Sequence, residues 1–289
     1  MLQQEKKQNP TDFFHRLKRL PGFRELLALR EERQIHALCR RTGMLDLQDK
    51  LLDAIGATIA AGPFSGMRYL NSSSGSVLGA KILGCYEAEL HGIISEVCDW
   101  RPDVLIDIGA AEGYYAVGFA RLLGNSGTGA NDSTVVAFEG NFIARQRLAR
   151  LARANDVRTR LEIYGFASPP VLSSHLQSAK RPVVWCDIEG GEHDLLDPSR
   201  IAGLDKAMIV LETHEAITGH PADIIVERFA TTHTHQRIKK QDRAVSDWFS
   251  PSLSGIFSTS EQTLLVNELR GVENDWMVLR PRKELKPSL

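Results

Sequence analysis

The stretch Val104–Tyr115, V-L-I-D-I-G-A-A-E-G-Y-Y, constrains the fold more than any other part of the chain. It begins with an apolar run that suits a strand buried on both faces. Three small residues then alternate through a turn, Gly109, Ala111 and Gly113, and a helix-like stretch follows. Small residues at such a turn let backbone N–H groups approach a ligand closely. The stretch therefore predicts a strand, a ligand-binding turn and a helix, although a tight turn without a ligand has the same pattern.

Two cofactor-binding turns resemble this one. The dinucleotide fingerprint G-x-G-x-x-G/A, counted from Gly109, needs a small residue where the chain has Tyr114. The other pattern, acidic-x-Gly-x-Gly-x-Gly, is typical of S-adenosylmethionine-dependent methyltransferases. Asp107, Gly109 and Gly113 match it, and Ala111 replaces the middle glycine. The turn therefore favours S-adenosylmethionine over a dinucleotide as the ligand.

From residue 104 onward, predicted strands alternate with predicted helices. Such alternation indicates an α/β fold, a mostly parallel sheet with helices on both faces. Two further strands near the end of the chain lack a long crossover between them, so we expect an antiparallel pair. The predicted strands cover residues 104–107, 134–138, 161–164, 183–186, 207–211, 235–238 and 276–279.

The first 80 residues show helical periodicity and no strand pattern. Helices are predicted at 11–20, 23–41 and 45–61, followed by a polar loop at 71–76 and a helix at 81–97. We therefore expect a helical N-terminal extension, residues 1–80, before a main domain of residues 81–289. The extension could pack on the main domain, form a dimer or cover a substrate, and the sequence does not choose among these.

Composition restricts the class of partner. The chain has 289 residues with 35 Lys+Arg against 36 Asp+Glu, a net charge of -1, which disfavours nucleic acid as a partner. Its four cysteines show no C-x-x-C pair and are interpreted as reduced thiols. The polar N-terminus lacks a signal-peptide pattern and no apolar run is long enough to span a membrane, so we expect a cytoplasmic location.

Four of the predicted strands end on a carboxylate: Asp107, Glu139, Asp187 and Glu212. Because the carboxyl ends of parallel strands meet at one edge of the sheet, where ligands bind in open α/β folds, we expect these acids to gather there. Each acid alone could be a solvated surface charge, but the set is harder to explain in that way.

The acid after the second strand suits the ribose of a nucleoside cofactor. A carboxylate such as Glu139 can accept hydrogen bonds from two vicinal hydroxyls. After the third strand, Gly165 and Phe166 could flank an adenine with a backbone N–H and an aromatic face, and Phe166 could equally be a core residue.

The densest polar segments follow the fourth and fifth predicted strands, D-I-E-G-G-E-H at 187–193 and E-T-H-E at 212–215. Neighbouring strands lie about 4.8 Å apart, so both segments can face one site. Asp187, Glu189 and His214 are the candidate catalytic residues, and His214 is the preferred general base because imidazole titrates near neutrality. With Glu212 they could instead bind a divalent cation, although their spacing matches no fixed metal motif.

Taken together, four segments resemble the FkbM-type S-adenosylmethionine-dependent methyltransferases: D-I-G-A-A-E-G-Y-Y-A-V at 107–117, A-F-E-G-N at 137–141, D-I-E-G-G-E at 187–192 and E-T-H at 212–214. The resemblance covers residues 81–215 and departs at Gly140, where the family usually has proline; we expect this departure to matter little. It implies a Rossmann-like methyltransferase fold of seven strands with an antiparallel last pair. It also implies O-methylation of a sugar or another small-molecule hydroxyl.

These observations lead to one main hypothesis and two alternatives. The main hypothesis is a methyltransferase that binds S-adenosylmethionine through Asp107, Gly109, Ala111, Gly113, Glu139, Gly165, Phe166 and Asp187. The first alternative is a nucleotide- or dinucleotide-dependent enzyme, and the second is a catalytically silent scaffold with the same fold. A homo-oligomer is compatible with each hypothesis, and the acceptor substrate cannot be deduced from the sequence.

Overall fold

The computed structural model describes residues 33–34, 36–74, 76–124, 133–219, 222–269 and 274–282. The helix predicted at 11–20 and the first part of the helix predicted at 23–41 lie outside these residues. Seven strands form one sheet in the order β3-β2-β1-β4-β5-β7-β6. The strands are β1 (Val104–Ile108), β2 (Thr134–Phe138), β3 (Leu161–Tyr164), β4 (Val183–Cys186), β5 (Met208–Glu212), β6 (His233–Ile238) and β7 (Trp276–Pro281).

The sheet has the mixed direction that the sequence predicts. Strands β1 to β5 pair in parallel, whereas β7 pairs antiparallel with both β5 and β6. The expectation of a mostly parallel seven-stranded α/β sheet with an antiparallel last pair is therefore confirmed. Each predicted strand lies within two residues of the observed one at both ends.

The connection between β6 and β7 is longer and more structured than predicted. It carries η3 (Val245–Asp247), α12 (Pro251–Ser254) and α13 (Thr259–Val266). Helix α13 packs against α3 (Met44–Ile55) and α4 (Leu78–Leu83). The sequence contains a signal for α13, because Ser258 and Glu261 form a capping box at its start. The expectation that the last two strands lack a long connection was wrong.

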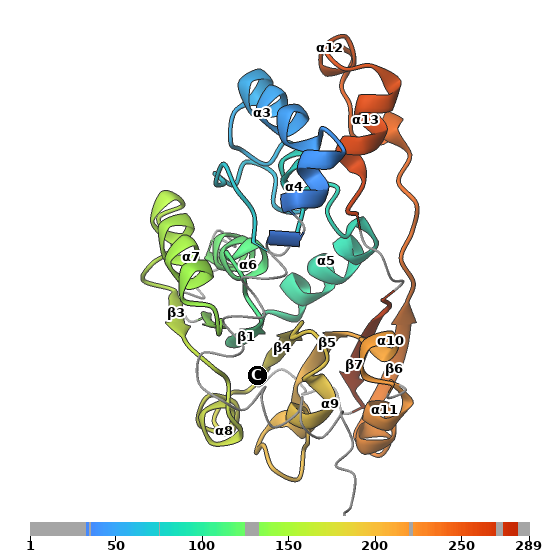
Figure 1. Cartoon of the computed structure of the whole chain (residues 1–289). Helices are drawn as coiled ribbons and strands as arrows, with labels where there is room; N and C mark the ends of the chain where they lie inside the picture. Colours follow the sequence, from blue (N-terminus) through green and yellow to red (C-terminus); the bar gives the residue numbers. More distant parts are fainter. Residues whose placement is uncertain are drawn as a thin grey trace, which may run out of the picture.

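Helices cover both faces of the sheet (Figure 1). One face packs against α5 (His91–Trp100), α6 (Tyr114–Gly124) and α7 (Phe142–Ala154), and the other against α8 (Pro169–Leu176) and α11 (Asp223–Phe229). Side chains along each strand alternate between the two faces, so every strand contributes to both. In β4, for example, Trp185 points to the first face and Val184 to the second. The helices after α4 are η1 (Ala88–Leu90), α5 (His91–Trp100), α6 (Tyr114–Gly124), α7 (Phe142–Ala154), α8 (Pro169–Leu176), α9 (Glu192–Leu195), η2 (Leu204–Lys206), α10 (Glu215–Thr218) and α11 (Asp223–Phe229).

Two predicted helices are shorter than the sequence pattern suggested. The helix predicted at 45–61 is α3 (Met44–Ile55), which ends at Gly56 with a φ of 76°. The helix predicted at 81–97 is divided into α4 (Leu78–Leu83) and α5, separated by Gly84 with a φ of 88°. Glycine adopts these positive φ values without strain, and helix periodicity alone does not reveal them.

The described part of the N-terminal region shares a core with the rest of the molecule. Met44, Leu51 and Phe64 belong to the same apolar cluster as Trp185 and Val278. Residues 56–70 form a loop that is closed by a bridge between Thr58 and Arg68. The division into residues 1–80 and 81–289 stays a prediction; position 80 lies inside α4.

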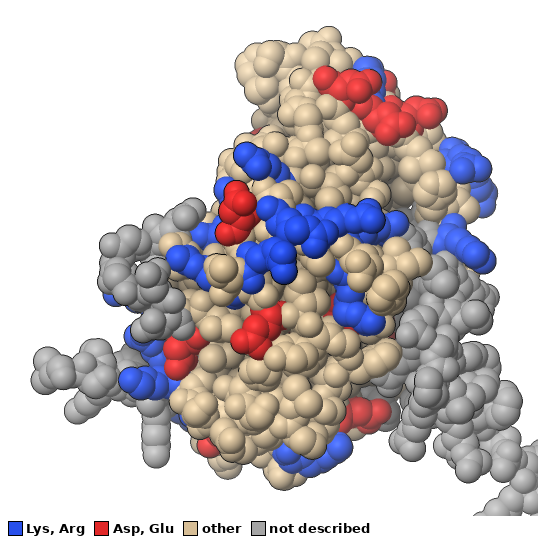
Figure 2. Space-filling view, turned by 90° about the vertical axis from the view of Figure 1, so that its left-hand side faces the viewer, with Lys and Arg blue, Asp and Glu red and all other residues tan. Residues whose placement is uncertain are grey.

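The face of the molecule that carries α7 is rich in basic side chains (Figure 2). Arg150 and Arg153 of α7 are exposed there, while Leu148 and Leu151 of the same helix are buried. Helix α7 is therefore amphipathic, with its basic side chains in solvent and its apolar side chains packed against the core. No helix in the described ranges combines the length and apolar character that crossing a bilayer requires.

A substitution at Gly84 tests whether the break between α4 and α5 requires glycine at this position. A Cβ at this residue would lie 2.1 Å from the carbonyl oxygen of Ala61, and the φ of 88° is unfavourable for an L side chain. We expect Gly84→Ala to lower the free energy of unfolding by roughly 2–4 kcal/mol in urea titration. Gly92→Ala is the matched control, because a Cβ there meets nothing within 4 Å. It should be neutral or stabilising by up to about 1 kcal/mol, and equal losses in both variants would contradict this interpretation.

Candidate functional site

The four predicted carboxylates lie at the carboxyl edge of the sheet as two pairs. Asp107, near the end of β1, and Glu139, directly after β2, interact through their charges. Asp187, directly after β4, and Glu212, the last residue of β5, form the second interacting pair. The pairs lie on either side of the junction between β1 and β4, where the strand order reverses. Ligands of open α/β sheets bind at such a switch point.

The turn after β1 has a backbone that its small residues permit. Gly109 has a φ of 89°, and a Cβ there would lie 1.6 Å from the carbonyl oxygen of Asp187. Gly113 has a φ of 101° and leaves room for the Leu148 side chain, since a Cβ would approach its Cδ1 to 2.2 Å. Ala111 has a φ of 46°, a left-handed conformation that costs more for alanine than for glycine. The glycines are therefore required by packing, independently of any ligand.

Asp107 is 2% exposed, at the end of β1. Burial raises the pKa of its carboxyl to about 7, although the backbone N–H of Ala116 favours the ionised form. Its Oδ2 atom has no hydrogen-bond partner among the described residues. This carboxyl is therefore buried and only partly satisfied, at the base of the candidate cofactor turn.

Glu139 connects β2 to the turn. Its Oε2 accepts a hydrogen bond of 2.8 Å from the backbone N–H of Ala111, and its Oε1 accepts one of 2.6 Å from the N–H of Asn141. Burial raises its pKa, and these two N–H groups act in the opposite direction. A carboxylate has about four acceptor positions, so two remain for other donors. Glu139 therefore has acceptor capacity to spare, and its role as a ligand of the ribose stays a prediction.

Phe166 is a surface residue and is not part of the core, which decides between the two interpretations of the sequence. Its side chain is 52% exposed. A Cβ at Gly140 would lie 2.4 Å from the Phe166 ring, so this ring position depends on glycine at 140. A side chain at 140 would require this exposed ring to turn, and the expectation that glycine in place of proline matters little stays a prediction. At Gly165 a Cβ would have open space except for Arg145 at 3.9 Å.

His214 is surrounded by carboxylates. Its Nδ1 lies 3.0 Å from Oε1 of Glu192, and its Nε2 lies 3.1 Å from Oε2 of Glu212. Nε2 also lies 3.3 Å from Oε2 of Glu189 and 3.6 Å from Oδ1 of Asp187. The sequence predicted three of these four neighbours as site residues. Glu192, in the same D-I-E-G-G-E segment, was not assigned a role, and its Oε1 also accepts the N–H of Ile188 at 2.8 Å.

This environment changes the role expected for His214. Burial opposes protonation of the imidazole, but contacts with Glu189, Glu192 and Glu212 outweigh burial and raise the pKa of His214. A protonated imidazole has no lone pair to accept a proton. The contacts therefore argue against His214 as a general base near neutral pH, and they favour it as the positive charge that holds the carboxylates together.

The accessible carboxylates of the cluster are Asp187 and Glu189. Their side chains are 31% and 63% exposed, whereas those of Glu212 and His214 are 5% and 0% exposed. Burial and the charge of Glu212 raise the pKa of Asp187 well above its ordinary value. Glu189 has a φ of 54°, and contact with His214 lowers its pKa. Asp187 is thus the member of the cluster that combines access with a raised proton affinity.

The same residues offer ligand atoms for a divalent cation. Ligand atoms of Asp187, Glu212 and His214 lie within 4.8 Å of one another. Oδ1 of Asp187 and Nε2 of His214 have no partner with hydrogen-bond geometry in the described part of the chain. Two carboxylates and an imidazole suit several divalent metals. The residues present therefore fit a cation, and Glu189, also predicted as a ligand, is the most exposed of the set.

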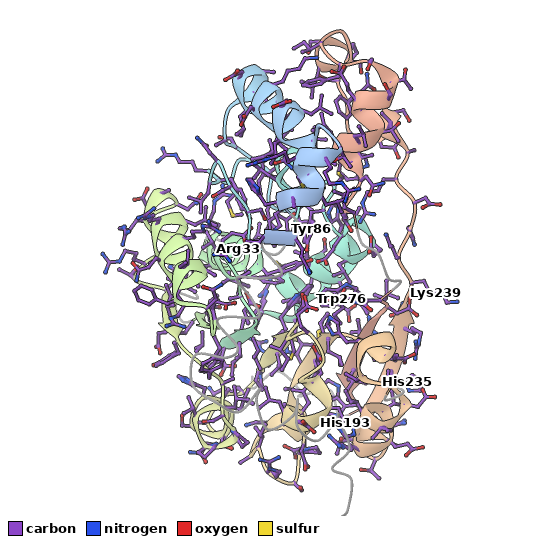
Figure 3. All side chains as sticks on the ribbon, in the orientation of Figure 1. Arg33, Tyr86, His193, His235, Lys239 and Trp276 are labelled. Atoms are coloured by element: carbon purple, nitrogen blue, oxygen red, sulfur yellow. The ribbon has the colours of Figure 1, made fainter. Side chains whose placement is uncertain are left out.

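A hollow beside His214 extends the site toward α9 and α10. Its lining includes Glu192, His193, Thr213 and Thr218. His193 packs against Arg228, with His193 Nε2 and Arg228 Nη2 3.1 Å apart. In Figure 3, His193 is part of α9, whereas Tyr86 and Trp276 lie higher in the view, near α5.

Sequence reasoning missed a second group of buried charges, which lies close enough to the first for Glu89 and Glu212 to interact through their charges. Arg243 contacts Glu89 at 2.9 Å and Glu268 at 2.6 Å, and the Oε1 of Glu268 accepts the N–H of Glu87 at 2.6 Å. Burial raises the pKa of Glu268 to about 7. These residues come from the loop after α4 and from the segment between β6 and β7, so only the tertiary structure brings them together.

Comparison with known proteins gives structural neighbours only. No family model matches the chain, and no curated protein matches it. One neighbour is the O-methyltransferase TomG from Streptomyces achromogenes, involved in tomaymycin synthesis and bound to SAM, with 14% identity, 68% of this chain and 80% of TomG covered, and a TM-score of 0.45. Another is an O-methyltransferase from Bacillus cereus in complex with SAH, with 11% identity, 65% and 78% covered, and a TM-score of 0.41. Similarities at this level carry no argument about activity.

The buried carboxyl of Asp107 predicts a pH dependence of stability. With its pKa raised from 3.8 to about 7, the folded protein keeps a proton that the unfolded chain releases. The contribution of Asp107 to stability therefore falls as the pH rises through this window. Asp107→Asn cannot ionise, so it should be close to wild type at pH 4.5 and more stable at pH 8 by on the order of 2 kcal/mol.

Thermal unfolding without ligand, measured across this pH range, checks the prediction. Asp194→Asn is the control, because that side chain is 84% exposed and its loss should give no pH-dependent difference. A stability difference for Asp107→Asn that stays constant from pH 4.5 to 8 would rule out the shifted carboxyl.

Proposed function

We propose that this protein is an S-adenosylmethionine-dependent methyltransferase that methylates a hydroxyl group of a small molecule. The observation that carries the proposal is the contact between Glu139 and the turn. The carboxylate at the end of β2 accepts the N–H of Ala111, so the ribose candidate and the small-residue turn form one continuous surface. Strand order, the acidic residue before the turn and Tyr114 in place of a small residue all favour this cofactor over a dinucleotide.

Each part of the cofactor would meet a different part of the surface. The turn 109–113 supplies backbone N–H groups for the methionine and ribose side, and Glu139 accepts from ribose hydroxyls. The exposed ring of Phe166 can flank the adenine. The methyl group would then face the junction of β1 and β4, toward Asp187. We also propose that the enzyme is of the FkbM type. This part of the proposal rests on the four sequence segments that resemble that family.

Methyl transfer from a sulfonium is an in-line displacement, so alignment supplies much of the rate. The acceptor hydroxyl also has to lose a proton. We assign this proton to Asp187, which is accessible and has a raised pKa. His214 stabilises the ionised carboxylates from below, and Glu189 lies at the exposed side of the same imidazole.

A second candidate mechanism uses a divalent cation, and the grouping of Asp187, Glu212 and His214 is the observation that favours it. These three residues would hold the ion. A bound cation lowers the pKa of a coordinated hydroxyl and orients it. Both mechanisms need a positive charge among these carboxylates. In the first it is the imidazolium of His214, and in the second it is a metal ion, so an experiment can distinguish them.

Cofactor binding tests the main proposal. Calorimetric titration with S-adenosylmethionine should show binding by the wild type, and Glu139→Ala should weaken it about 10- to 100-fold, because it removes charge-assisted hydrogen bonds. Glu162→Ala on the neighbouring strand β3 is the control, since Glu162 is exposed, and its affinity should stay within about twofold. Binding of NADH in place of S-adenosylmethionine would support the dinucleotide alternative, and a lack of binding to either ligand would support the scaffold.

Asp187 tests the assignment of the proton acceptor. A screen of small-molecule extracts with methyl-labelled cofactor would identify an acceptor. Asp187→Asn should then reduce turnover about 10²- to 10⁴-fold while cofactor affinity stays within about tenfold. The exposed variant Asp194→Asn should retain wild-type turnover. If Asp187→Asn loses cofactor binding as severely as turnover, Asp187 acts on the cofactor and the assignment is wrong.

Removal of metal separates the two mechanisms. For the imidazolium mechanism, protein dialysed against a chelator should keep its turnover, and titration with Mg²⁺ or Mn²⁺ should release no binding heat. Loss of turnover that Mg²⁺ restores, together with metal binding that disappears in Glu212→Gln, would establish the cation mechanism instead.

A further inference from the structure

Glu112 lies in the middle of the candidate cofactor turn, between Ala111 and Gly113. It is fully buried, at 0% exposure. Its Oε1 accepts hydrogen bonds from the Tyr69 hydroxyl at 2.6 Å and the Ser73 hydroxyl at 2.7 Å, and its Oε2 accepts one from the N–H of Ser74 at 3.0 Å. These donors come from the polypeptide that precedes α4, about 40 residues before the turn. One side chain thus joins the turn to a segment remote in sequence.

The strongest partner of Glu112 is Lys81. Its Nζ lies 2.6 Å from Oε1 of Glu112, and both side chains are almost completely buried. Nζ also donates to the Ser73 hydroxyl at 3.1 Å and lies over the rings of Tyr86 and Tyr114. Removing one partner of such a pair leaves an uncompensated buried charge, which is strongly unfavourable. Although burial opposes ionisation, Lys81 and the hydroxyl donors keep the pKa of Glu112 below its ordinary value.

The turn is therefore held from two sides by adjacent residues. On the sheet side, the N–H of Ala111 donates to Glu139, the proposed ribose ligand. On the other side, the carboxylate of Glu112 binds residues 69–74 and α4. Only one peptide bond separates the two contacts, so a shift of the backbone at 111–113 affects both.

The segment after α4 continues toward the carboxylate site. The hydroxyl of Tyr115, three residues after Glu112, donates to Glu87. Cys85 accepts from Arg243 Nε through its carbonyl at 2.7 Å, and Arg243 pairs with Glu89. Glu89 is close enough to Glu212 for their charges to interact. Residues 81–89 thus connect the cofactor turn with the side of the site that faces β5.

We propose that Glu112 is a positioning residue: its ion pair with Lys81 makes binding of the cofactor to the turn and ordering of residues 69–74 and α4 depend on each other. The inference rests on the proposed function. When α4 is ordered, residues 81–89 are held against the side of the site that faces β5. Binding of the cofactor to the turn therefore affects that side of the site. Coupling of this kind is reciprocal, and either partner of the ion pair should be required for it.

Amide hydrogen exchange with S-adenosylhomocysteine as the probe tests the proposal. In the wild type, saturating ligand should slow exchange in peptides covering residues 69–83. In Glu112→Gln and in Lys81→Met this slowing should disappear, and the dissociation constant should rise by between about 5- and 150-fold, the usual range of coupling. Glu96→Gln is the matched control, because it removes an ion pair with Arg280 elsewhere in the molecule. It should keep both the slowing and the affinity.

The outcomes separate this role from a structural one. A purely structural role lowers the melting temperature of both variants and leaves affinity and ligand-induced slowing unchanged well below it, which would overturn the proposal. If the variants do not fold, the exchange measurement on the wild type tests the proposal. Ligand binding by the wild type without slower exchange at 69–83 would also overturn the proposal. Absence of any binding by the wild type would instead overturn the proposed function on which this inference rests.

Discussion

Residue 109 has to be glycine because the carbonyl oxygen of Asp187 occupies the place of a Cβ, at 1.6 Å. This close approach of two backbone segments joins the end of β4 to the turn after β1. It sets the distance between the candidate cofactor surface, built from Glu139 and the turn, and the carboxylate cluster around His214. A side chain at 109 would separate the two halves, and the proposed methyl transfer would depend on their alignment.

The second constraint is charge. Four carboxylates surround His214, and Glu89 and Glu268 contact Arg243 in a second group. Buried carboxylates of this density need a positive charge close by. An imidazolium supplies one at His214, and a divalent cation could supply it at the same atoms. The electrostatic problem is the same for both mechanisms, which explains why a proton-transfer site and a metal site can share these residues.

The third feature is the connection between the N-terminal region and the turn. Residues 44–83 pack into the same core as the sheet, and Glu112 and Lys81 place a charged contact within that packing. Two residues of the polar loop predicted at 71–76, Ser73 and Ser74, donate hydrogen bonds to the carboxylate of Glu112. A region that the sequence left without a role becomes part of the surroundings of the cofactor turn.

Much of the fold follows from local sequence. The strand positions, the parallel direction of the first five strands and the acids at the edge of the sheet depend on short-range patterns: apolar runs, small-residue turns and the residue at each strand end. The antiparallel last pair was expected from a short connection, which the structure does not have, and from the family resemblance. These patterns also identified Asp187, Glu189, Glu212 and His214 as neighbours, because adjacent parallel strands bring their carboxyl ends together. The helices at 81–97 and 45–61 were misjudged where a single glycine changes the backbone direction, which periodicity does not reveal.

Tertiary structure alone decided which carboxylates surround His214, the exposure of Phe166 and the partners of Glu112. Each depends on groups that are far apart in sequence, such as Lys81 for Glu112, or on how several charges share one buried volume. The sequence by itself determined which chemical groups reach the edge of the sheet. Only packing determined which of them are accessible, which carry a proton and which hold others in place, because burial and charge interactions act through space and are not encoded in any local pattern.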